Sequence, residues 1–162
     1  MKKIVLLLIL SITYSCGPYS FTGVSTTAET YQVNFFQNNA PIVEPGLDRD
    51  FTNALQDLIL NQTNLDLVGT NGQLIYEGEI TEFRIAPMSA TAQNTAAQNR
   101  LTIGVNLRFY DTRNSDNDFE KKYSFFYDYA DGKQLNEVKT EAFQVIFERI
   151  TQDIFNDTLA KW

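Results

Sequence analysis

Three carboxylates lie close together in the middle of the chain, and paired carboxylates can perform acid–base chemistry. Glu77, Glu79 and Glu82 fall in one alternating segment, and alternation places Glu77 and Glu79 on the same face of a strand. Their Cα atoms would lie roughly 7 Å apart, a separation at which two carboxyl groups can flank a glycosidic bond. A solvated strand face has the same pattern, and we favour that interpretation over a carboxylate hydrolase.

Composition excludes most other catalytic and metal-binding arrangements. The chain of 162 residues has no histidine and one cysteine, which excludes a Ser-His-Asp triad, a Cys-His pair and a histidine-containing zinc site. Neither GxGxxG nor GxxxxGK[ST] occurs, and the acidic segment 111–120 lacks the central glycine of an EF-hand loop. The net charge of −7 argues against nucleic-acid binding. We therefore expect no catalytic residue, no metal and no cofactor.

The single cysteine, Cys16, follows a segment typical of a lipoprotein signal peptide. Lys2 and Lys3 precede the apolar run IVLLLILSI, which is too short to cross a bilayer because a spanning helix needs about 20 apolar residues. The small Ser15 stands directly before Cys16, so the site resembles a bacterial lipobox. Acylation would remove a thiol that has no disulfide partner in the chain. The alternative is an ordinary secretory signal that contains a thiol.

These features predict the domain organisation. We expect residues 1–15 to be a signal peptide, residues 16–27 to be the lipidated cysteine and a tether, and residues 28–162 to be a single α+β domain. Gly17 rather than an aspartate follows Cys16, which by resemblance to lipoprotein sorting signals favours the outer membrane with the domain facing the periplasm.

Hydrophobic periodicity predicts the elements that must position any site. We expect a first strand over 28–36 with Tyr31, Val33 and Phe35 on one face, and two amphipathic helices over 47–61 and 135–162. Strands are predicted over 73–85, 100–111 and 118–129, with a short extra strand over 65–68. Asn71-Gly72 favours a type I′ hairpin turn, and residues 88–99 have the composition of a mobile loop at a hairpin tip.

The order β–α–β–β–β–α predicts a two-layer α+β sandwich. A mostly antiparallel sheet of about four strands would be covered on one face by the two helices, because each apolar face must be buried against another element. Lys121 and Lys122 suit a strand at a guarded sheet edge. Aromatic residues make up 13% of the chain, and those on the uncovered face would be either partly exposed core or a docking surface.

Several segments, taken together in their order and spacing, resemble one family. These are CGPYSFTG at the cysteine, FTNALQDLILNQTNLDLV on the first helix, GEITEFRIAP and NRLTIGVNLRFYD on the middle strands, and IFERITQDIFNDTLAKW at the end. The chain resembles the LptE family over nearly all of the mature sequence. The resemblance implies a non-enzymatic outer-membrane lipoprotein that plugs the β-barrel protein LptD, helps it to fold and assists lipopolysaccharide transport to the outer leaflet.

Anionic lipopolysaccharide would be met by cations, and three arginines are the candidates. Arg84, Arg100 and Arg108 lie on the predicted middle strands, with Arg84 and Arg100 near the tip of the hairpin that these strands would form. The alternative is that these arginines only pair with Glu79 or Glu82. A different function for the whole chain also stays open, in which a periplasm-facing lipoprotein binds a small ligand or glycan on an aromatic sheet face.

Overall fold

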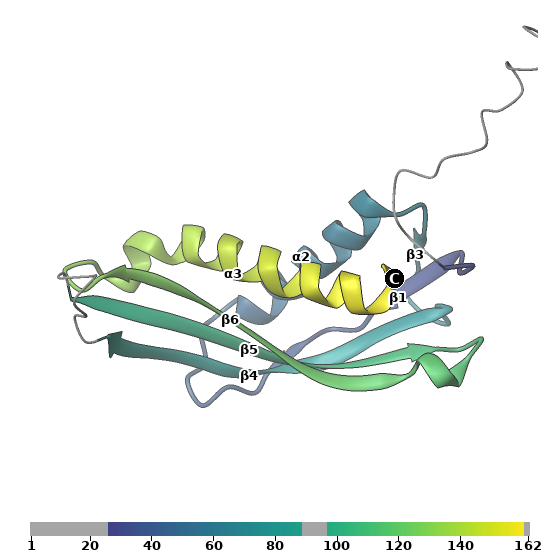
Figure 1. Cartoon of the computed structure of the whole chain (residues 1–162), viewed down its shortest axis with the longest axis horizontal. Helices are drawn as coiled ribbons and strands as arrows, with labels where there is room; N and C mark the ends of the chain where they lie inside the picture. Colours follow the sequence, from purple (N-terminus) through teal and green to yellow (C-terminus); the bar gives the residue numbers. More distant parts are fainter. Residues whose placement is uncertain (1–25, 89–96, 161–162) are drawn as a thin grey trace, which may run out of the picture.

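The computed structural model describes residues 26–88 and 97–160, which form one sheet with two helices on one of its faces (Figure 1). This confirms the predicted α+β fold. The elements follow the chain in this order: β1 (Thr30–Val33), β2 (Gln37–Asn38), α2 (Leu47–Gln62), β3 (Asp66–Leu67), β4 (Leu74–Met88), β5 (Gln98–Asp111), the 3-10 helix η1 (Ser115–Asn117), β6 (Phe119–Ala130) and α3 (Leu135–Thr158).

Three long antiparallel strands, β4, β5 and β6, carry most of the sheet. They correspond to the predicted strands 73–85, 100–111 and 118–129, but β4 continues to Met88 and β5 begins at Gln98. The ends of the predicted loop 88–99 are therefore strand, and its middle lies outside the described residues. Alternate residues of β5 are fully buried against the helices, because the inward face alternates as predicted; these are Leu101, Ile103, Val105 and Leu107.

A β-bulge in β4 decides which residues enter the core. The register of β4 against β5 shifts between Ile80 and Glu82, so that Thr81 and Glu82 both lie on the outer face. Without this extra residue the alternation would turn Glu82 inward and Phe83 outward. Phe83 is instead buried, with its ring edge against Phe143 of α3 at a centroid distance of 6.3 Å.

The first predicted strand is divided in two. Tyr31 and Val33 are buried as expected, but Phe35 is 56% exposed and Phe36 takes the inward position. β1 ends at Val33 and β2 occupies only two residues, and both strands pair with β4 in parallel. The sheet is therefore mixed, with six strands rather than about four.

The hairpin predicted at Asn71-Gly72 does not form. β3 and β4 run parallel and are separated by β1, in the order β3-β1-β4. Asn71 does adopt a left-handed conformation, with φ of 57°. A Cβ on Gly72 would lie 2.7 Å from the Cβ of Gln32, so glycine is required where this connection crosses β1. The predicted type I′ turn is therefore absent, since Gly72 does not share the positive φ of Asn71, and β3 and β4 each pair with β1 rather than with one another.

The two helices cover one face of the sheet. α2 lies over β1, β2 and β3, and α3 lies over β6 and part of β5 (Figure 1). Phe51 of α2 packs edge-on against Phe147 of α3 at a centroid distance of 5.5 Å, which connects the two helices. Its ring also meets Phe36, in the segment before α2, edge-on at 5.2 Å. α3 begins as predicted and ends at Thr158, and Val145 of its predicted apolar stripe is 38% exposed. Neither helix in the ranges 26–88 and 97–160 is long and apolar enough to cross a bilayer.

Candidate functional site

The face of the sheet that carries no helix holds all three candidate arginines, but only Arg84 and Arg100 are neighbours, since Arg108 lies eight residues, about 27 Å, from Arg100 along β5. Arg84 of β4 stands opposite Thr102, and Arg100 and Arg108 follow on β5 with the same alternation. Arg84 and Arg100 are diagonal neighbours across the antiparallel pair, at a Cβ separation of about 7 Å. The hairpin on which the prediction placed them is therefore present, and all three side chains share one surface, which we call the polar face.

Arg108 is held by both of the carboxylates that could have formed a catalytic pair. Its guanidinium donates to Glu79 at 2.9 Å and to Glu77 at 3.3 Å. Asn106 donates to Glu79 at 2.9 Å, and this hydrogen bond is the main cause of a lowered Glu79 pKa, with Arg108 adding to it. A general acid at neutral pH needs a raised pKa. The arrangement therefore fits an ion-paired strand face rather than the carboxylate hydrolase.

Arg100 is fixed by a bidentate pair and an aromatic ring. It donates to the two oxygens of Asp128 at 2.7 and 2.8 Å, and its guanidinium carbon lies 3.6 Å from the centre of the Phe126 ring. The hydrogen bonds to Asp128 raise the pKa of Arg100, although burial opposes them. The alternative expectation was that aromatic side chains on this face bind a ligand. The guanidinium of Arg100 instead lies over the Phe126 ring.

Arg84 is the most accessible of the three arginines. Its side chain is 58% exposed, against 29% for Arg100 and 32% for Arg108, and its described carboxylate partner is Glu82 at 2.9 Å. Next to it, the bulge in β4 borders a surface hollow of about 560 Å³. The hollow combines apolar and cationic side chains; its lining residues are Pro41, Ile42, Thr81, Glu82, Phe83, Arg84 and Lys122.

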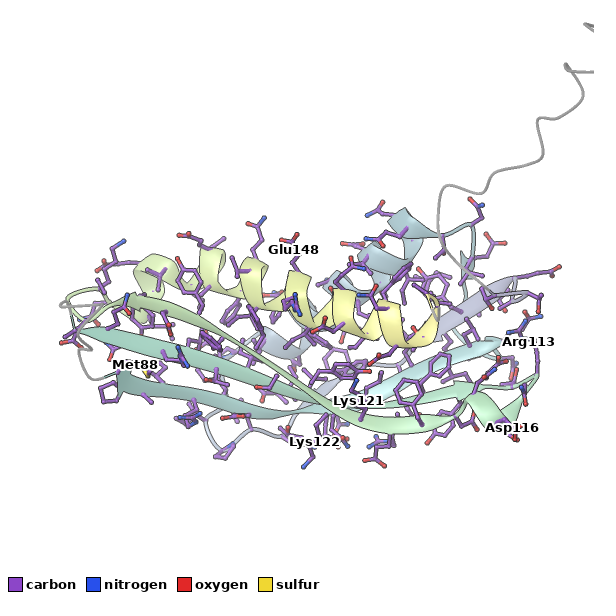
Figure 2. All side chains as sticks on the ribbon, viewed as in Figure 1. Met88, Arg113, Asp116, Lys121, Lys122 and Glu148 are labelled. Atoms are coloured by element: carbon purple, nitrogen blue, oxygen red, sulfur yellow. The ribbon has the colours of Figure 1, made fainter. Side chains whose placement is uncertain are left out.

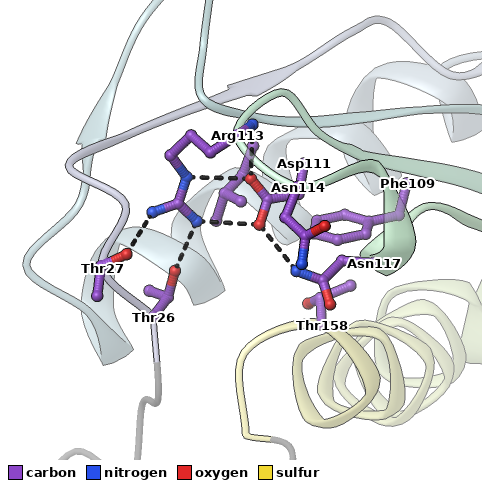
Figure 3. A pocket seen from close by; sticks show the side chains of 9 residues that line it. Thr26, Thr27, Phe109, Asp111, Arg113, Asn114, Asn117 and Thr158 are labelled. Atoms are coloured by element: carbon purple, nitrogen blue, oxygen red, sulfur yellow. Dashed lines mark hydrogen bonds and ion pairs between the residues drawn. The ribbon is translucent and has the colours of Figure 1, made fainter.

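A second polar cluster lies at the opposite end of the sheet, where the N-terminal segment enters (Figures 2 and 3). The Asp111 carboxylate is 6% exposed and accepts hydrogen bonds from the Arg113 guanidinium at 3.0 Å and from Asn117 at 3.1 Å. Arg113 also donates to the hydroxyls of Thr27 at 2.8 Å and Thr26 at 3.3 Å. These groups line a cavity of about 370 Å³. We call this cluster the Arg113 clamp.

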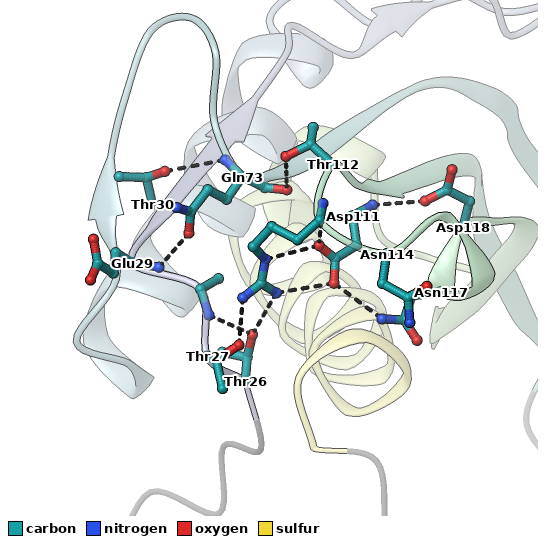
Figure 4. Close-up of polar contacts among 12 residues, drawn as sticks. Thr26, Thr27, Glu29, Thr30, Gln73, Asp111, Thr112, Asn114, Asn117 and Asp118 are labelled. Atoms are coloured by element: carbon teal, nitrogen blue, oxygen red, sulfur yellow. Dashed lines mark hydrogen bonds and ion pairs between the residues drawn. The ribbon is translucent and has the colours of Figure 1, made fainter.

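Further hydrogen bonds extend the clamp to β1 and β4 (Figure 4). The Gln73 side chain accepts from the Glu29 N–H at 2.8 Å, and the Gln73 N–H donates to the Thr30 hydroxyl at 3.1 Å. Thr112 donates to the Gln73 carbonyl through its N–H and its hydroxyl. In the sequence, the Asp-x-Arg spacing of Asp111 and Arg113 is the one hint of this cluster, and it lies in the segment 111–120 that we considered as an EF-hand loop.

The predicted lipidation residue, Cys16, lies outside the described residues. Thr26, the first described residue, follows it by ten positions and lies in the clamp. Within the described ranges, no group of three or more Asp, Glu, Cys or His side chains could hold a metal ion.

Comparison with solved structures supports the fold alone. PelC from Paraburkholderia phytofirmans, crystallised as a dodecamer, has a TM-score of 0.51 at 9% identity, covering 85% of this chain and 93% of its own. A minor lipoprotein from Acinetobacter baumannii has a TM-score of 0.51 at 12% identity, covering 85% and 100%. A hypothetical protein from Chlamydia trachomatis has a TM-score of 0.52 at 10% identity, covering 83% and 99%.

A search of curated proteins finds no match. A family model, however, matches residues 28–158, which is almost the whole described fold. Its description is lipopolysaccharide assembly, and it agrees with the resemblance seen in the sequence. The chain therefore belongs to the LptE family, whose members are outer-membrane lipoproteins of lipopolysaccharide assembly.

Proposed function

We propose that this protein is the lipid-anchored plug of an LptD-like outer-membrane β-barrel, that it helps the barrel to fold, and that it catalyses no reaction. The observation that carries the proposal is the family match over residues 28–158. The polar face is compatible with it, because the lumen of a large outer-membrane barrel is polar. Acyl chains on Cys16 would hold the protein at the membrane in which the barrel lies.

The experiment is recovery of the lipidated protein, tagged at its C-terminus, from detergent-solubilised outer membranes. We expect a stoichiometric β-barrel partner that stays bound in high salt, identified by mass spectrometry. Cys16→Ser should leave the fold intact but lower the yield of the complex, since the anchor no longer confines the protein to the membrane. Recovery of the lipidated protein without any barrel would refute the plug function.

Lipopolysaccharide would contact the polar face at its cationic end. Of the three candidate arginines, Arg84 is the one that we assign first, because it is the most exposed and has Lys122 and the apolar Ile42 beside it in one hollow. A guanidinium pairs bidentately with phosphate, and the apolar wall suits acyl chains. Arg100 and Arg108 would first have to release Asp128 and Glu79.

This ranking is tested by co-sedimentation of the purified protein with lipopolysaccharide aggregates. Arg84→Ala should weaken binding by about tenfold, in keeping with the loss of one charge-assisted contact. Arg49→Ala is the matched control, since Arg49 is also an exposed arginine paired with a neighbouring carboxylate, but on α2. Equal binding by the two variants would remove Arg84 from the site.

The alternative of a ligand or glycan on an aromatic sheet face gains no support from the polar face. Most aromatic side chains of β4, β5 and β6 point to the helices. The two exposed on the other face, Tyr110 and Phe126, lie far apart on different strands, and Phe126 carries Arg100 across its ring.

A further inference from the structure

The hollow beside the β4 bulge contains a carboxylate of the protein itself. Glu82 lines it together with the cations Arg84 and Lys122, and it accepts a hydrogen bond from the Arg84 guanidinium at 2.9 Å. Figure 2 shows Lys122 on the side of the sheet away from the helices, which is the polar face. An anionic group that enters the hollow would therefore meet a negative charge already placed at Arg84.

A bulge and a glycine together place Glu82 in the hollow. Plain alternation along β4 would turn Glu82 toward the helices, and the bulge turns it to the polar face instead. The residue opposite it on β5 is Gly104, where a Cβ would lie 3.0 Å from the Glu82 Cβ and 3.3 Å from a carboxylate oxygen. The Glu82 side chain therefore lies over space that any other residue at position 104 would fill. Its position follows from the two backbones and not from a side-chain rotamer alone.

The pair between Glu82 and Arg84 occupies only part of the guanidinium. Glu82 contacts Nε, and in the described part of the chain the two terminal nitrogens of Arg84 have no hydrogen-bond partner. Arg100 differs, because Asp128 binds both its Nε and a terminal nitrogen, at 2.7 and 2.8 Å. A guanidinium can bind phosphate through two of its nitrogens at once. Arg84 keeps one such side open, next to the carboxylate of Glu82.

Lys122 adds a second cation to the hollow. Among the described residues, no carboxylate lies within ion-pair distance of its ammonium group, whereas the neighbouring Lys121 pairs with Asp157 at 2.6 Å. The hollow thus combines two positive charges with one negative charge. How strongly it attracts an anion depends on the Glu82 carboxylate.

We propose that Glu82 regulates this site by competing with a lipid phosphate for Arg84. When the site is empty, the carboxylate neutralises Arg84. A phosphate on the open side of the guanidinium lies within a few ångströms of the carboxylate, and at a partly exposed surface the repulsion between such charges lowers the affinity about tenfold. The inference rests on the lipopolysaccharide contact proposed for Arg84, and it makes Glu82 the residue that sets the affinity of that contact.

A competing carboxylate suits a protein that passes its lipid on. A transport site must bind strongly enough to be occupied and weakly enough to release what it binds. Arg84 and Lys122 without Glu82 would hold a lipid phosphate for longer, since differences in affinity between related complexes lie mostly in the dissociation rate. Glu82 shifts the balance toward release.

The test is co-sedimentation of the purified protein with lipopolysaccharide aggregates, in which Glu82→Gln should bind about tenfold more tightly than the unchanged chain. Glu82 is 37% exposed and glutamine has the same length, so the fold should be retained. Asp153→Asn is the matched control, because Asp153 is 40% exposed and pairs with Arg149 at 3.1 Å, but on α3. It removes the same charge and should leave binding unchanged.

A double variant shows whether Glu82 acts through Arg84. In an Arg84→Ala chain, the further change Glu82→Gln should raise the affinity by less than about threefold, because the cation for which Glu82 competes is gone. Displacement of labelled lipopolysaccharide by an unlabelled excess should be about tenfold slower from the Glu82→Gln chain than from the unchanged chain. A merely structural role of Glu82 would not slow this release.

The outcomes separate failure of this inference from failure of the proposed contact. If Arg84→Ala binds as tightly as the unchanged chain, the contact at Arg84 is refuted and the role of Glu82 with it. If Arg84→Ala weakens binding but Glu82→Gln raises it no more than Asp153→Asn does, only the competition is refuted. Weaker binding by Glu82→Gln that appears with Mg²⁺ and disappears in excess EDTA would also overturn the competition, because Glu82 would then share a divalent cation with the phosphate.

Discussion

At the scale of single residues, Asp111 is the most constrained charge in the described structure. Burial alone would raise its pKa, but the hydrogen bonds from Arg113 and Asn117 outweigh burial, and the pKa lies below its ordinary value of 3.8. The ionised carboxylate therefore stabilises the folded state. It also orients Arg113, which in turn holds Thr26 and Thr27.

Asp111→Asn should lower the free energy of unfolding at pH 7 by about 2 kcal/mol, the typical loss for hydrogen bonds to a charged group. Because the folded pKa is depressed, this contribution is complete above pH 3.8 and disappears as the pH falls through the folded value. Urea unfolding of both proteins should therefore give curves that converge below pH 3.8. Asp116→Asn, an exposed change in the same loop, should show no such difference.

At the scale of elements, β4 depends on one glycine for its contact with β5 and with the segment before α2. A Cβ on Gly78 would collide with the Asn106 carbonyl oxygen and lie 2.8 Å from the Phe36 ring. Phe36 is fully buried and meets Phe51 of α2, so Gly78 lets the helix layer approach the middle of the sheet.

Gly78→Ala should destabilise the fold by about 3 kcal/mol, at the upper end of the cost of overpacking, because one of the two obstacles is backbone. Gly132→Ala is the control, since a Cβ there meets nothing within 4 Å. In thermal unfolding, the melting temperature of Gly78→Ala should lie clearly below that of Gly132→Ala. Similar melting temperatures would show that β4 can move away from β5 at little cost.

The sequence predicted the elements whose patterns are long and regular. β5 and α2 follow their periodicities almost to the residue, because a single buried face determines the pattern. The bulge at Thr81 and the exposure of Phe35 were not predictable, since each depends on a neighbouring strand that the local pattern does not contain. The hairpin prediction at Asn71-Gly72 was wrong for the same reason, because a turn signal does not specify whether the two flanking strands pair with each other or with a third strand.

The candidate site was predictable in part. Alternation along β5 was enough to place Arg100 and Arg108 on one face. Plain alternation along β4 would turn Arg84 to the helix side, and only the bulge at Thr81 brings it to the same face as the other two. The partners of Arg100 come from β6, and pairing between strands cannot be read from one strand. The Arg113 clamp joins Thr26 and Asp111, which are far apart in sequence, and so it was missed.

At the scale of the whole molecule, the tip of the β4–β5 hairpin and the Arg113 clamp lie at opposite ends of the sheet (Figure 2). Met88 lies at one end and Arg113 at the other (Figure 2). β4 spans this length with 15 residues, about 50 Å. The chain between Cys16 and Thr26 reaches at most about 35 Å, so a lipid on Cys16 keeps the clamp end near the membrane.

A fluorophore at the clamp end should therefore transfer energy to a membrane dye more efficiently than one at the hairpin end. Asn114→Cys and Met88→Cys provide these positions, both exposed, and acylation of Cys16 would leave each introduced thiol unique. The measurement uses the lipidated protein in vesicles without its barrel. Equal transfer from the two positions would contradict a body held at its clamp end.

The position of β1 between β3 and β4 has a mechanical consequence. The chain from the predicted anchor enters the fold through Thr26 and Thr27 and continues into β1, which pairs in parallel on both sides. A pull between the anchor and a body held at its far end would load these two ladders along the strand. Their hydrogen bonds would then have to break together rather than one after another. Tension on a lipid tether at Cys16 would therefore load β1 in shear, so that the fold could not be unravelled from this end one hydrogen bond at a time.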